Sequence, residues 1–184
     1  QKIVIMLTII TGASSNHFRT LLQFLTNLTY SESQKDTRVI VYDLGLTDSQ
    51  NVEMKNKFGE GFIYEKFDFS KYPGYVNIKI AAGQYAWKPI ILNDVCKKYY
   101  GNLGEDDKYF MWCDAGTLFN GRQTRVRQIL TESHIFTPES FGIISTWVHP
   151  LTRAYMGWKG PLNLRNRTGG FIGVDYSVEW VRNL

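Results

Sequence analysis

Short apolar runs and amphipathic stretches alternate along the chain. The first apolar run, residues 2–10, is rich in β-branched residues and has no polar face, which predicts a strand buried on both sides. In residues 17–28 the apolar side chains recur at helical spacing, which predicts an amphipathic helix. The same patterns predict further strands at 38–42, 62–67, 109–113, 142–146 and 170–174. They predict further helices at 49–58, from 81 or 84 to 100, at 125–131 and at 177–184.

This order of strands and helices predicts an α/β fold, an open and mostly parallel sheet with helices on both faces. In such folds, ligands bind at the carboxyl ends of the strands. Three segments are expected at that edge, residues 11–16, 43–45 and 114–117. Asp43 and Asp114 each follow a strand directly, so two of these three segments begin with a carboxylate.

Composition excludes several classes of protein. A chain of 184 residues with 43% hydrophobic and 15% aromatic residues is too apolar to be disordered. Two cysteines are too few for a miniprotein held by disulfides. The longest apolar run is too short to span a membrane. A net charge of +4 favours a small anionic ligand and gives no indication of a nucleic-acid surface.

The first candidate site is Thr11-Gly12-Ala13-Ser14-Ser15. It resembles the opening of short-chain dehydrogenases, in which glycines let the backbone approach a pyrophosphate. The later glycines of that fingerprint are replaced here by Asn16, His17 and Phe18. An NAD(P)-dependent oxidoreductase of Rossmann type is therefore kept as an alternative.

Lys88 and Asp114 are candidates for binding phosphate. Lys88 stands in the first turn of a predicted helix, where a cation opposes the helix dipole unless an anion is also bound there. The alternative is that Trp87 belongs to the core and Lys88 extends to water. Asp114 is followed by Ala115 and Gly116, and such small residues let a diphosphate and its metal approach the backbone. The alternative for Asp114 is an acid that caps a turn.

Two further segments need an explanation. Gly169-Gly170 precedes an apolar strand, which indicates close packing against a ligand or a neighbouring backbone. The acidic cluster Glu105-Asp106-Asp107 precedes the strand at 109–113, so it lies at the opposite end of that strand from Asp114. We interpret this cluster as a solvated turn.

Five segments, taken in order, resemble a family of animal proteins with a glycosyltransferase-like domain. They are residues 14–18, 39–46, 71–73, 85–90 and 112–116, and the most specific pieces are Tyr-Asp-Leu-Gly and Trp-Lys-Pro. More broadly, the chain is similar to glycosyltransferases of the GT-A architecture. In these enzymes a strand ends in an Asp-x-Asp motif, whose acids hold a divalent metal and the diphosphate of a sugar nucleotide.

The resemblance implies a GT-A-like sheet and transfer of a sugar from a nucleoside-diphosphate sugar, first of all a UDP-sugar, to a glycan or protein acceptor. It makes Asp114 the first acid of the motif and the metal ligand for Mn²⁺ or Mg²⁺, although Gly116 stands where the second acid is usual. It places residues 11–13 and Asp43 at the nucleoside, and Gly169-Gly170 near the transferred sugar. The donor-binding set is thus Thr11, Gly12, Ala13, Asp43, Lys88, Asp114, Ala115, Gly116, Gly169 and Gly170.

Four residues are candidates for the acceptor side. Trp147 and Trp158 are expected to stack on acceptor sugars. Asp175, at a predicted strand end, is a candidate general base, and His149 is the second catalytic candidate. A sugar-nucleotide or glycan-binding module without catalysis is a further alternative.

We expect residues 1–184 to form a single nucleotide-sugar-binding domain, which the resemblance to GT-A proteins suggests is truncated at its C-terminus. The compartment is left open, either the Golgi or secretory lumen for a membrane-anchored parent or otherwise the cytoplasm.

Overall fold

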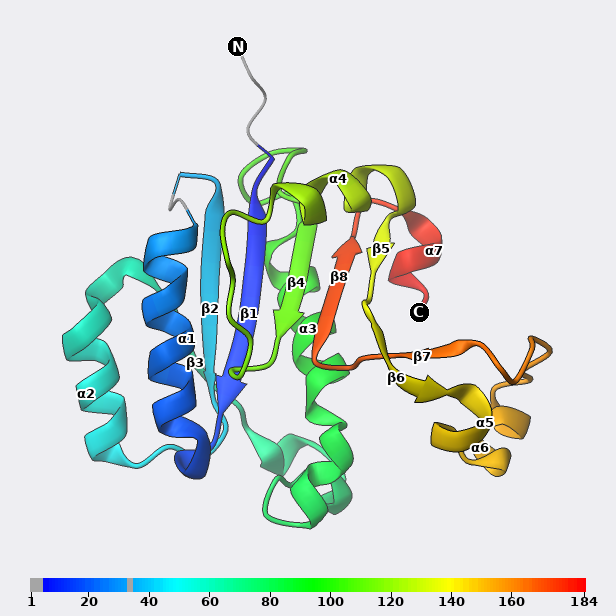
Figure 1. Cartoon of the computed structure of the whole chain (residues 1–184). Helices are drawn as coiled ribbons and strands as arrows, with labels where there is room; N and C mark the ends of the chain where they lie inside the picture. The colour runs from blue at the N-terminus through cyan, green and yellow to red at the C-terminus, as the bar shows by residue number, and fades with distance from the viewer. Residues whose placement is uncertain (1–4, 33–34) are drawn as a thin grey trace.

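The computed structural model describes residues 5–32 and 35–184 and has the predicted α/β architecture (Figure 1). Its main sheet has six strands in the order β3-β2-β1-β4-β8-β5. Strands β1 to β4 are parallel, whereas β8 runs antiparallel to both β4 and β5. The bounds are β1 (Leu7–Ala13), β2 (Thr37–Asp43), β3 (Ile63–Lys66), β4 (Tyr109–Cys113), β5 (Ile135–Phe136) and β8 (Phe171–Asp175).

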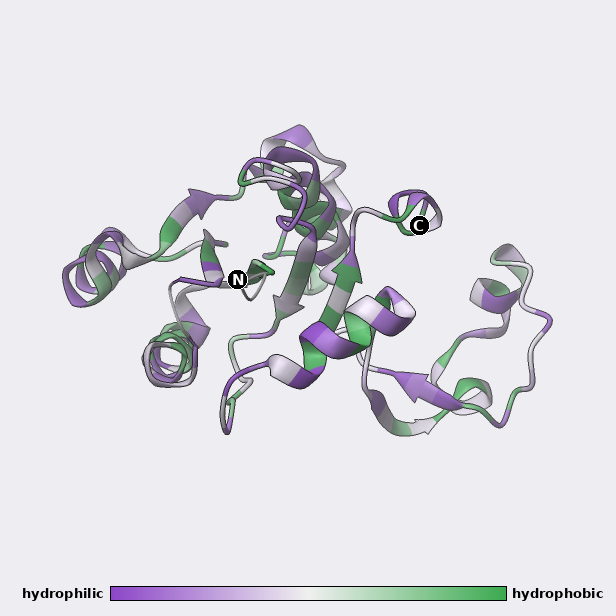
Figure 2. Cartoon of the chain, turned by 90° about the horizontal axis from the view of Figure 1, so that it is seen from above, coloured by the Kyte–Doolittle hydropathy of each residue, from purple (hydrophilic) through white to green (hydrophobic). Residues whose placement is uncertain are grey.

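Helices cover both faces of this sheet. Apolar residues of α1 and α4 pack on one face, and those of α3 and α7 pack on the other. Figure 1 shows α1 in front of the sheet and α3 behind it, and Figure 2 shows hydrophobic and hydrophilic stretches alternating along the helices. All seven residues of β1 are buried, as expected for a strand with helices on both sides. The helices are α1 (Phe18–Ser31), α2 (Asp48–Phe58), α3 (Trp87–Tyr99), α4 (Thr124–Ser133) and α7 (Glu179–Arg182).

A small lobe is inserted between β5 and β8. It contains the antiparallel pair β6 (Glu139–Ile143) and β7 (Arg165–Arg167), with the short helices α5 (Ile144–Trp147) and α6 (Pro150–Tyr155). Figures 1 and 2 show the lobe to one side of the layered sheet. The predicted strand at 142–146 is wrong beyond Ile143, because α5 begins at Ile144 and brings the Trp147 indole against Gly142.

Several other boundaries differ from those predicted. The first strand was predicted over 2–10, of which residues 2–4 lie outside the described residues. It begins at Leu7 and continues to Ala13 because residues 11–13 keep their pairing with β2. The last helix is shorter than predicted, ending at Arg182. Helix α2 begins at Asp48, one residue before the predicted start, where Thr47 and Gln50 form a capping box.

Short 3-10 turns connect these elements. They are η1 (Ser15–His17), η2 (Gly59–Gly61), η3 (Phe69–Lys71), η4 (Gly74–Val76) and η5 (Ala81–Tyr85). The turn η5 precedes α3, which therefore begins at Trp87 rather than at 81 or 84. Within the described part of the chain, no helix is both long enough and apolar enough to cross a membrane.

The acidic turn before β4 is less solvated than predicted. The Asp107 side chain is fully buried and accepts two hydrogen bonds from the Arg38 guanidinium, at 3.1 and 2.8 Å. Asp107 also accepts a hydrogen bond from the Leu103 amide at 3.2 Å. Glu105 is exposed, as predicted. A linear pattern of three acids does not show that the third one faces an arginine on β2, two strands away from β4 in the sheet.

Candidate functional site

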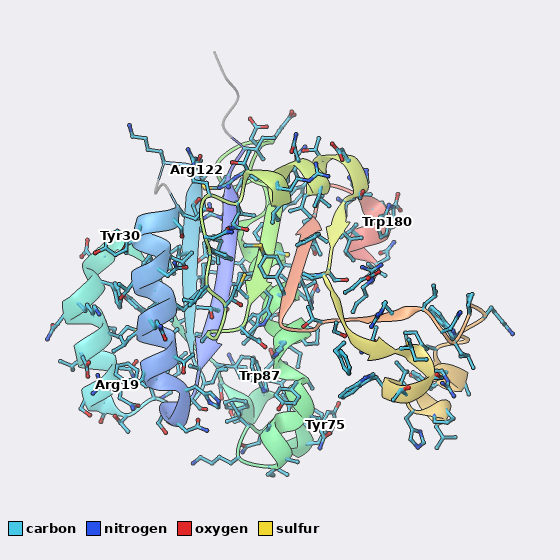
Figure 3. The ribbon with its side chains drawn as sticks, in the orientation of Figure 1. Arg19, Tyr30, Tyr75, Trp87, Arg122 and Trp180 are labelled. Carbon is cyan, nitrogen blue, oxygen red and sulfur yellow. The ribbon has the colours of Figure 1, made fainter. Side chains whose placement is uncertain are left out.

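A cavity of about 660 Å³ opens at the carboxyl ends of β1, β2 and β4, at the lower edge of the sheet in Figure 1. Its wall contains residues 12–17 at and after the end of β1, Leu44 and Gly45 after β2, and Asp114, Ala115 and Gly116 after β4. Residues from 78 to 88 complete it, and Figure 3 shows Trp87 at this edge. The structure therefore brings together the three segments that the sequence placed at one edge of the sheet.

Asp114 and Lys88 form an ion pair in the cavity wall. The Lys88 Nζ lies 2.7 Å from Asp114 Oδ1 and 2.8 Å from Oδ2. The Trp112 indole N–H donates a second hydrogen bond to Oδ1 at 2.7 Å. The Lys88 side chain is only 14% exposed, whereas that of Asp114 is 44% exposed. The carboxylate therefore faces the cavity with both oxygens already engaged.

Aromatic rings surround the Lys88 ammonium. Its Nζ lies 5.1 Å from the ring centroid of Tyr85 and 5.6 Å from that of Trp87, within the range of cation–π attraction. Trp87 in turn packs edge to face on Trp112, with ring centroids 5.5 Å apart. These contacts, together with Asp114, hold the ammonium in one place.

The turn before α3 has an unusual backbone. All five residues of η5 have positive φ, from 44° at Ala81 to 63° at Gly83. Each non-glycine residue in such a conformation costs about 1–2 kcal/mol. A Cβ at Gly83 would lie 2.2 Å from the Val76 carbonyl oxygen, so only glycine fits there. The Trp87 indole donates a hydrogen bond to the Ala82 carbonyl at 3.1 Å, which ties the turn to α3.

The end of β1 supplies the opposite wall. A Cβ at Gly12 would meet the Tyr42 carbonyl oxygen at 3.0 Å, so this glycine lets β1 and β2 approach. Beyond it, Ser14 Oγ donates to Asn16 Oδ1 at 2.6 Å, and that oxygen lies 3.0 Å from His17 Nδ1. Ser14 and Asn16 belong to the segment 11–16 that the sequence placed at this edge, whereas His17 was not predicted as a site residue.

Four predicted donor-binding residues, Thr11, Asp43, Gly169 and Gly170, do not line the cavity. Thr11 is fully buried, and its hydroxyl finds no hydrogen-bond partner among the described residues. The Asp43 carboxylate shapes the loop after β2, accepting from the amides of Gly45 and Leu46 at 2.7 and 2.6 Å and from Asn51 Nδ2 at 3.0 Å. Gly169 also lies outside the wall.

Gly170 does not line the cavity but contacts Asp114, which does. Its carbonyl accepts a hydrogen bond from the Asp114 amide at 2.8 Å. A Cβ on Gly170 would lie 2.8 Å from Asp114 Oδ2. The expectation of close approach at Gly169-Gly170 therefore holds at the second glycine, and the partner is the Asp114 carboxylate.

The prediction of Asp175 as a general base at this site is wrong. Because β8 is antiparallel to β4, Asp175 pairs with Tyr109 at the start of β4, the opposite edge of the sheet from Asp114. There it is 3% exposed and lies 3.2 Å from His134 Nδ1. It also accepts hydrogen bonds from Ser177. The carboxyl end of a strand lies at the Asp114 edge only where that strand is parallel to β4, and β8 is not.

The other three acceptor-side candidates lie on the inserted lobe. Trp147 and Trp158 are 61% and 42% exposed. His149 begins α6, where its Nδ1 accepts a hydrogen bond from the Leu151 amide at 3.2 Å. None of these three residues contributes to the cavity wall. Their contact with an acceptor stays a prediction.

The cysteines do not supply a nucleophile. Burial, with a further contribution from the Asp114 charge, raises the pKa of the Cys113 thiol well above its usual range. Burial likewise raises the pKa of Cys96. Both thiols are therefore protonated at neutral pH and unreactive.

Metal ligands are sparse at the cavity. Among the described residues of its wall, Asp114 is the only carboxylate and His17 the only imidazole. No group of three or more His, Cys, Asp or Glu side chains that could hold a metal occurs in residues 5–32 and 35–184.

Solved structures similar to this fold are glycosyltransferases. The galactosyltransferase LgtC, solved with donor and acceptor sugar analogues, aligns with 96% of this chain and 60% of its own, at TM-score 0.60 and 14% identity. The bifunctional glycosyltransferase WbbM aligns with 96% of this chain and 32% of its own, at TM-score 0.64 and 8% identity. The chain thus spans about three-fifths of the length of LgtC.

A third similar structure is the mannosyltransferase PcManGT from Pyrobaculum calidifontis, solved with GDP-Man and Mn²⁺. It aligns with 95% of this chain and 45% of its own, at TM-score 0.53 and 14% identity. These likenesses establish the GT-A-like fold predicted from the sequence. No curated protein matches the chain. Residues 2–93, half of the sequence, match the family described as protein of unknown function DUF1647, and the chain therefore belongs to that family.

Proposed function

We propose that this chain binds a nucleoside-diphosphate sugar, first of all a UDP-sugar, in the cavity at the carboxyl edge of the sheet and transfers the sugar to a glycan or protein acceptor. The observation that carries the proposal is the position of the Lys88–Asp114 pair in the wall of that cavity, within a GT-A-like fold. Ligands of open α/β sheets bind at this edge. The cavity volume of about 660 Å³ suits a small-molecule ligand.

The chemistry of the wall supports a diphosphate ligand. In the transfer, an acceptor hydroxyl replaces the diphosphate at the anomeric carbon, and negative charge develops on the departing diphosphate. A fixed cation beside that group lowers the barrier because it is oriented before the reaction begins. Lys88 is such a cation, held by Asp114 and two aromatic rings. Tyr85 is 58% exposed and lines the cavity, where its ring can stack on a base or a sugar.

Mn²⁺ or Mg²⁺ at Asp114 was expected from the resemblance, and similar structures such as PcManGT were solved with Mn²⁺. The donor set here does not fit such an ion. Such an ion needs carboxylate oxygens that are free to coordinate it, beside substrate phosphates and water. The wall offers one carboxylate, and its oxygens are already bonded to an ammonium and an indole N–H. Gly116 adds no second acid.

A binding module without transfer is the second candidate function. It is favoured by one observation, that no carboxylate besides Asp114 lies among the described residues of the cavity wall to serve as a general base. Nucleotide release from a panel of UDP-sugars, measured with and without candidate acceptors, separates the two functions. Transfer or donor hydrolysis supports the enzyme, and binding without either supports the module.

The proposal is tested by thermal unfolding with UDP, GDP and NAD⁺. A ligand at a hundred times its Kd stabilises the folded state by about 2.7 kcal/mol, which for a chain of this size raises Tm by roughly 5–10 °C. We expect this rise with UDP. A rise with NAD⁺ alone would instead support the oxidoreductase alternative, and no rise with either UDP or GDP would refute the proposal.

A further inference from the structure

We infer that Lys88, held by Asp114, takes the place of a divalent metal in this site, so that the diphosphate of the donor is bound and neutralised without a metal ion. The inference rests on the proposed function and defines how the same cavity recognises its anion. It follows from four features of the wall: the carboxylate's existing partners, the position of the ammonium, its spare hydrogen-bonding capacity, and the space at Gly116.

The first feature is competition for Asp114. A divalent cation needs the carboxylate oxygens, but Lys88 Nζ lies within 2.7 and 2.8 Å of the two oxygens and Trp112 Nε1 lies 2.7 Å from one of them. A metal ion at this carboxylate would have to displace the ammonium or lie close to a like charge. The pair instead holds the Lys88 ammonium at a fixed position in the cavity wall.

The second feature is that the ammonium is oriented before any ligand arrives. Lys88 is the second residue of α3, and the turn before it is held by the Trp87 hydrogen bond to Ala82. The Tyr85 and Trp87 rings flank Nζ. The Lys88 side chain is 14% exposed, so it has little freedom to swing into solvent. A cation held in this way loses little entropy when it binds a phosphate oxygen.

The third feature is spare capacity for an anion. An ammonium carries three N–H donors, and Asp114 supplies the two acceptor oxygens that Lys88 contacts. At least one donor is thus free to meet a phosphate oxygen in the cavity that both residues line. Asp114 positions the ammonium and limits its pull on other anions, which leaves Lys88 as the group that touches the diphosphate.

The fourth feature is that position 116 has room for a side chain, so the absence of a second acid is not imposed by sterics. A Cβ on Gly116 would meet only Thr20 Cγ2, at 4.0 Å, and Gly116 is not among the glycines with positive φ. An aspartate therefore fits at this position. The site can be converted by substitution into one that carries both acids of the metal-binding motif.

The test is calorimetric titration of the full chain with UDP, once in EDTA and once in Mn²⁺. We expect the two Kd values to agree within about threefold. In EDTA, Lys88→Met should weaken UDP binding at least tenfold, which corresponds to about 1.4 kcal/mol. Lys97→Met, which removes an exposed lysine of the same helix, is the matched control and should leave Kd unchanged. Circular dichroism checks that each variant is folded.

The double variant Lys88→Met/Gly116→Asp supplies a gain of function. It removes the ammonium and adds the second acid, so we expect it to bind UDP in Mn²⁺ and not in EDTA. Binding of UDP by the unmodified chain in Mn²⁺ only would overturn the inference and leave the proposed function standing. Unchanged binding by Lys88→Met in EDTA would also overturn it. Failure to bind any nucleoside diphosphate in either buffer would refute the proposed function and the inference together.

Discussion

Asp107→Asn removes one charge from the buried pair that joins the turn before β4 to β2. The Asp107 side chain is 0% exposed and that of Arg38 is 11% exposed, with N–O distances of 3.1 and 2.8 Å. Removing one partner of a buried pair costs about 3–5 kcal/mol because the other charge is left uncompensated. Arg38 keeps its 3.1 Å hydrogen bond to Thr8 and its position 4.8 Å from the Tyr99 ring centroid, so the lower end applies. We expect a loss of about 3 kcal/mol.

Thermal and urea unfolding of three proteins measure this loss. For Asp107→Asn, a loss of about 3 kcal/mol lowers Tm by roughly 6–12 °C. Glu105→Gln, two residues away on the exposed part of the same turn, should stay within about 0.5 kcal/mol of the unmodified chain. Arg38→Met/Asp107→Leu removes both charges and should recover part of the loss. Equal stability of Asp107→Asn and Glu105→Gln would refute the reasoning.

Three further predictions concern β1, the glycine pair and the half-buried Tyr42. Thr11→Val removes a buried hydroxyl and should raise stability by about 1 kcal/mol in urea unfolding without changing UDP affinity, whereas weaker binding would place Thr11 in the donor site. Gly170→Ala pushes on Asp114 Oδ2 and should weaken UDP binding about tenfold in calorimetry, while Gly169→Ala, with no atom within 4 Å of its Cβ, serves as the control. Burial, with the Glu65 charge, raises the pKa of Tyr42 from 10.0 to about 12. The stability due to this shift is therefore full below pH 10 and is lost between pH 10 and about 12. Tyrosinate absorbance and the free energy of unfolding, measured over the same pH range, should change together. Ionisation of Tyr42 at pH 10 would contradict the prediction.

The sequence predicted the layers of the fold well because periodicity reports burial directly. The continuous apolar run of β1 and the helical spacing in α1 both follow from facing a core. The sense of β8 could not be predicted in this way, because a strand's side chains alternate identically in both directions. That ambiguity is why Asp175 was placed at the wrong edge.

In the candidate site, too, local patterns identified individual residues but not the contacts between them. Lys88 and Asp114 were identified separately, one from its position in a helix and the other from its position after a strand. Their 2.7 Å contact depends on how α3 packs beside β4, which no local pattern encodes. Asp43 illustrates a second limit of local patterns, because an acid after a strand suits a loop-shaping role as well as a ligand-binding one, and its contact with a donor stays a prediction.

The reversed direction of β8 has a consequence for how this protein can diversify. β5 ends, and β8 begins, at the edge where Asp114 lies, so the chain between them leaves and re-enters the sheet beside the cavity. Residues 137–170, which contain the β6–β7 lobe, form one long excursion with both ends anchored there (Figure 1). Insertions and deletions in this excursion leave the pairing of the six main strands intact. The fold thus separates the six-stranded sheet, which carries the cavity, from a segment that can change in length and in what it presents beside the cavity.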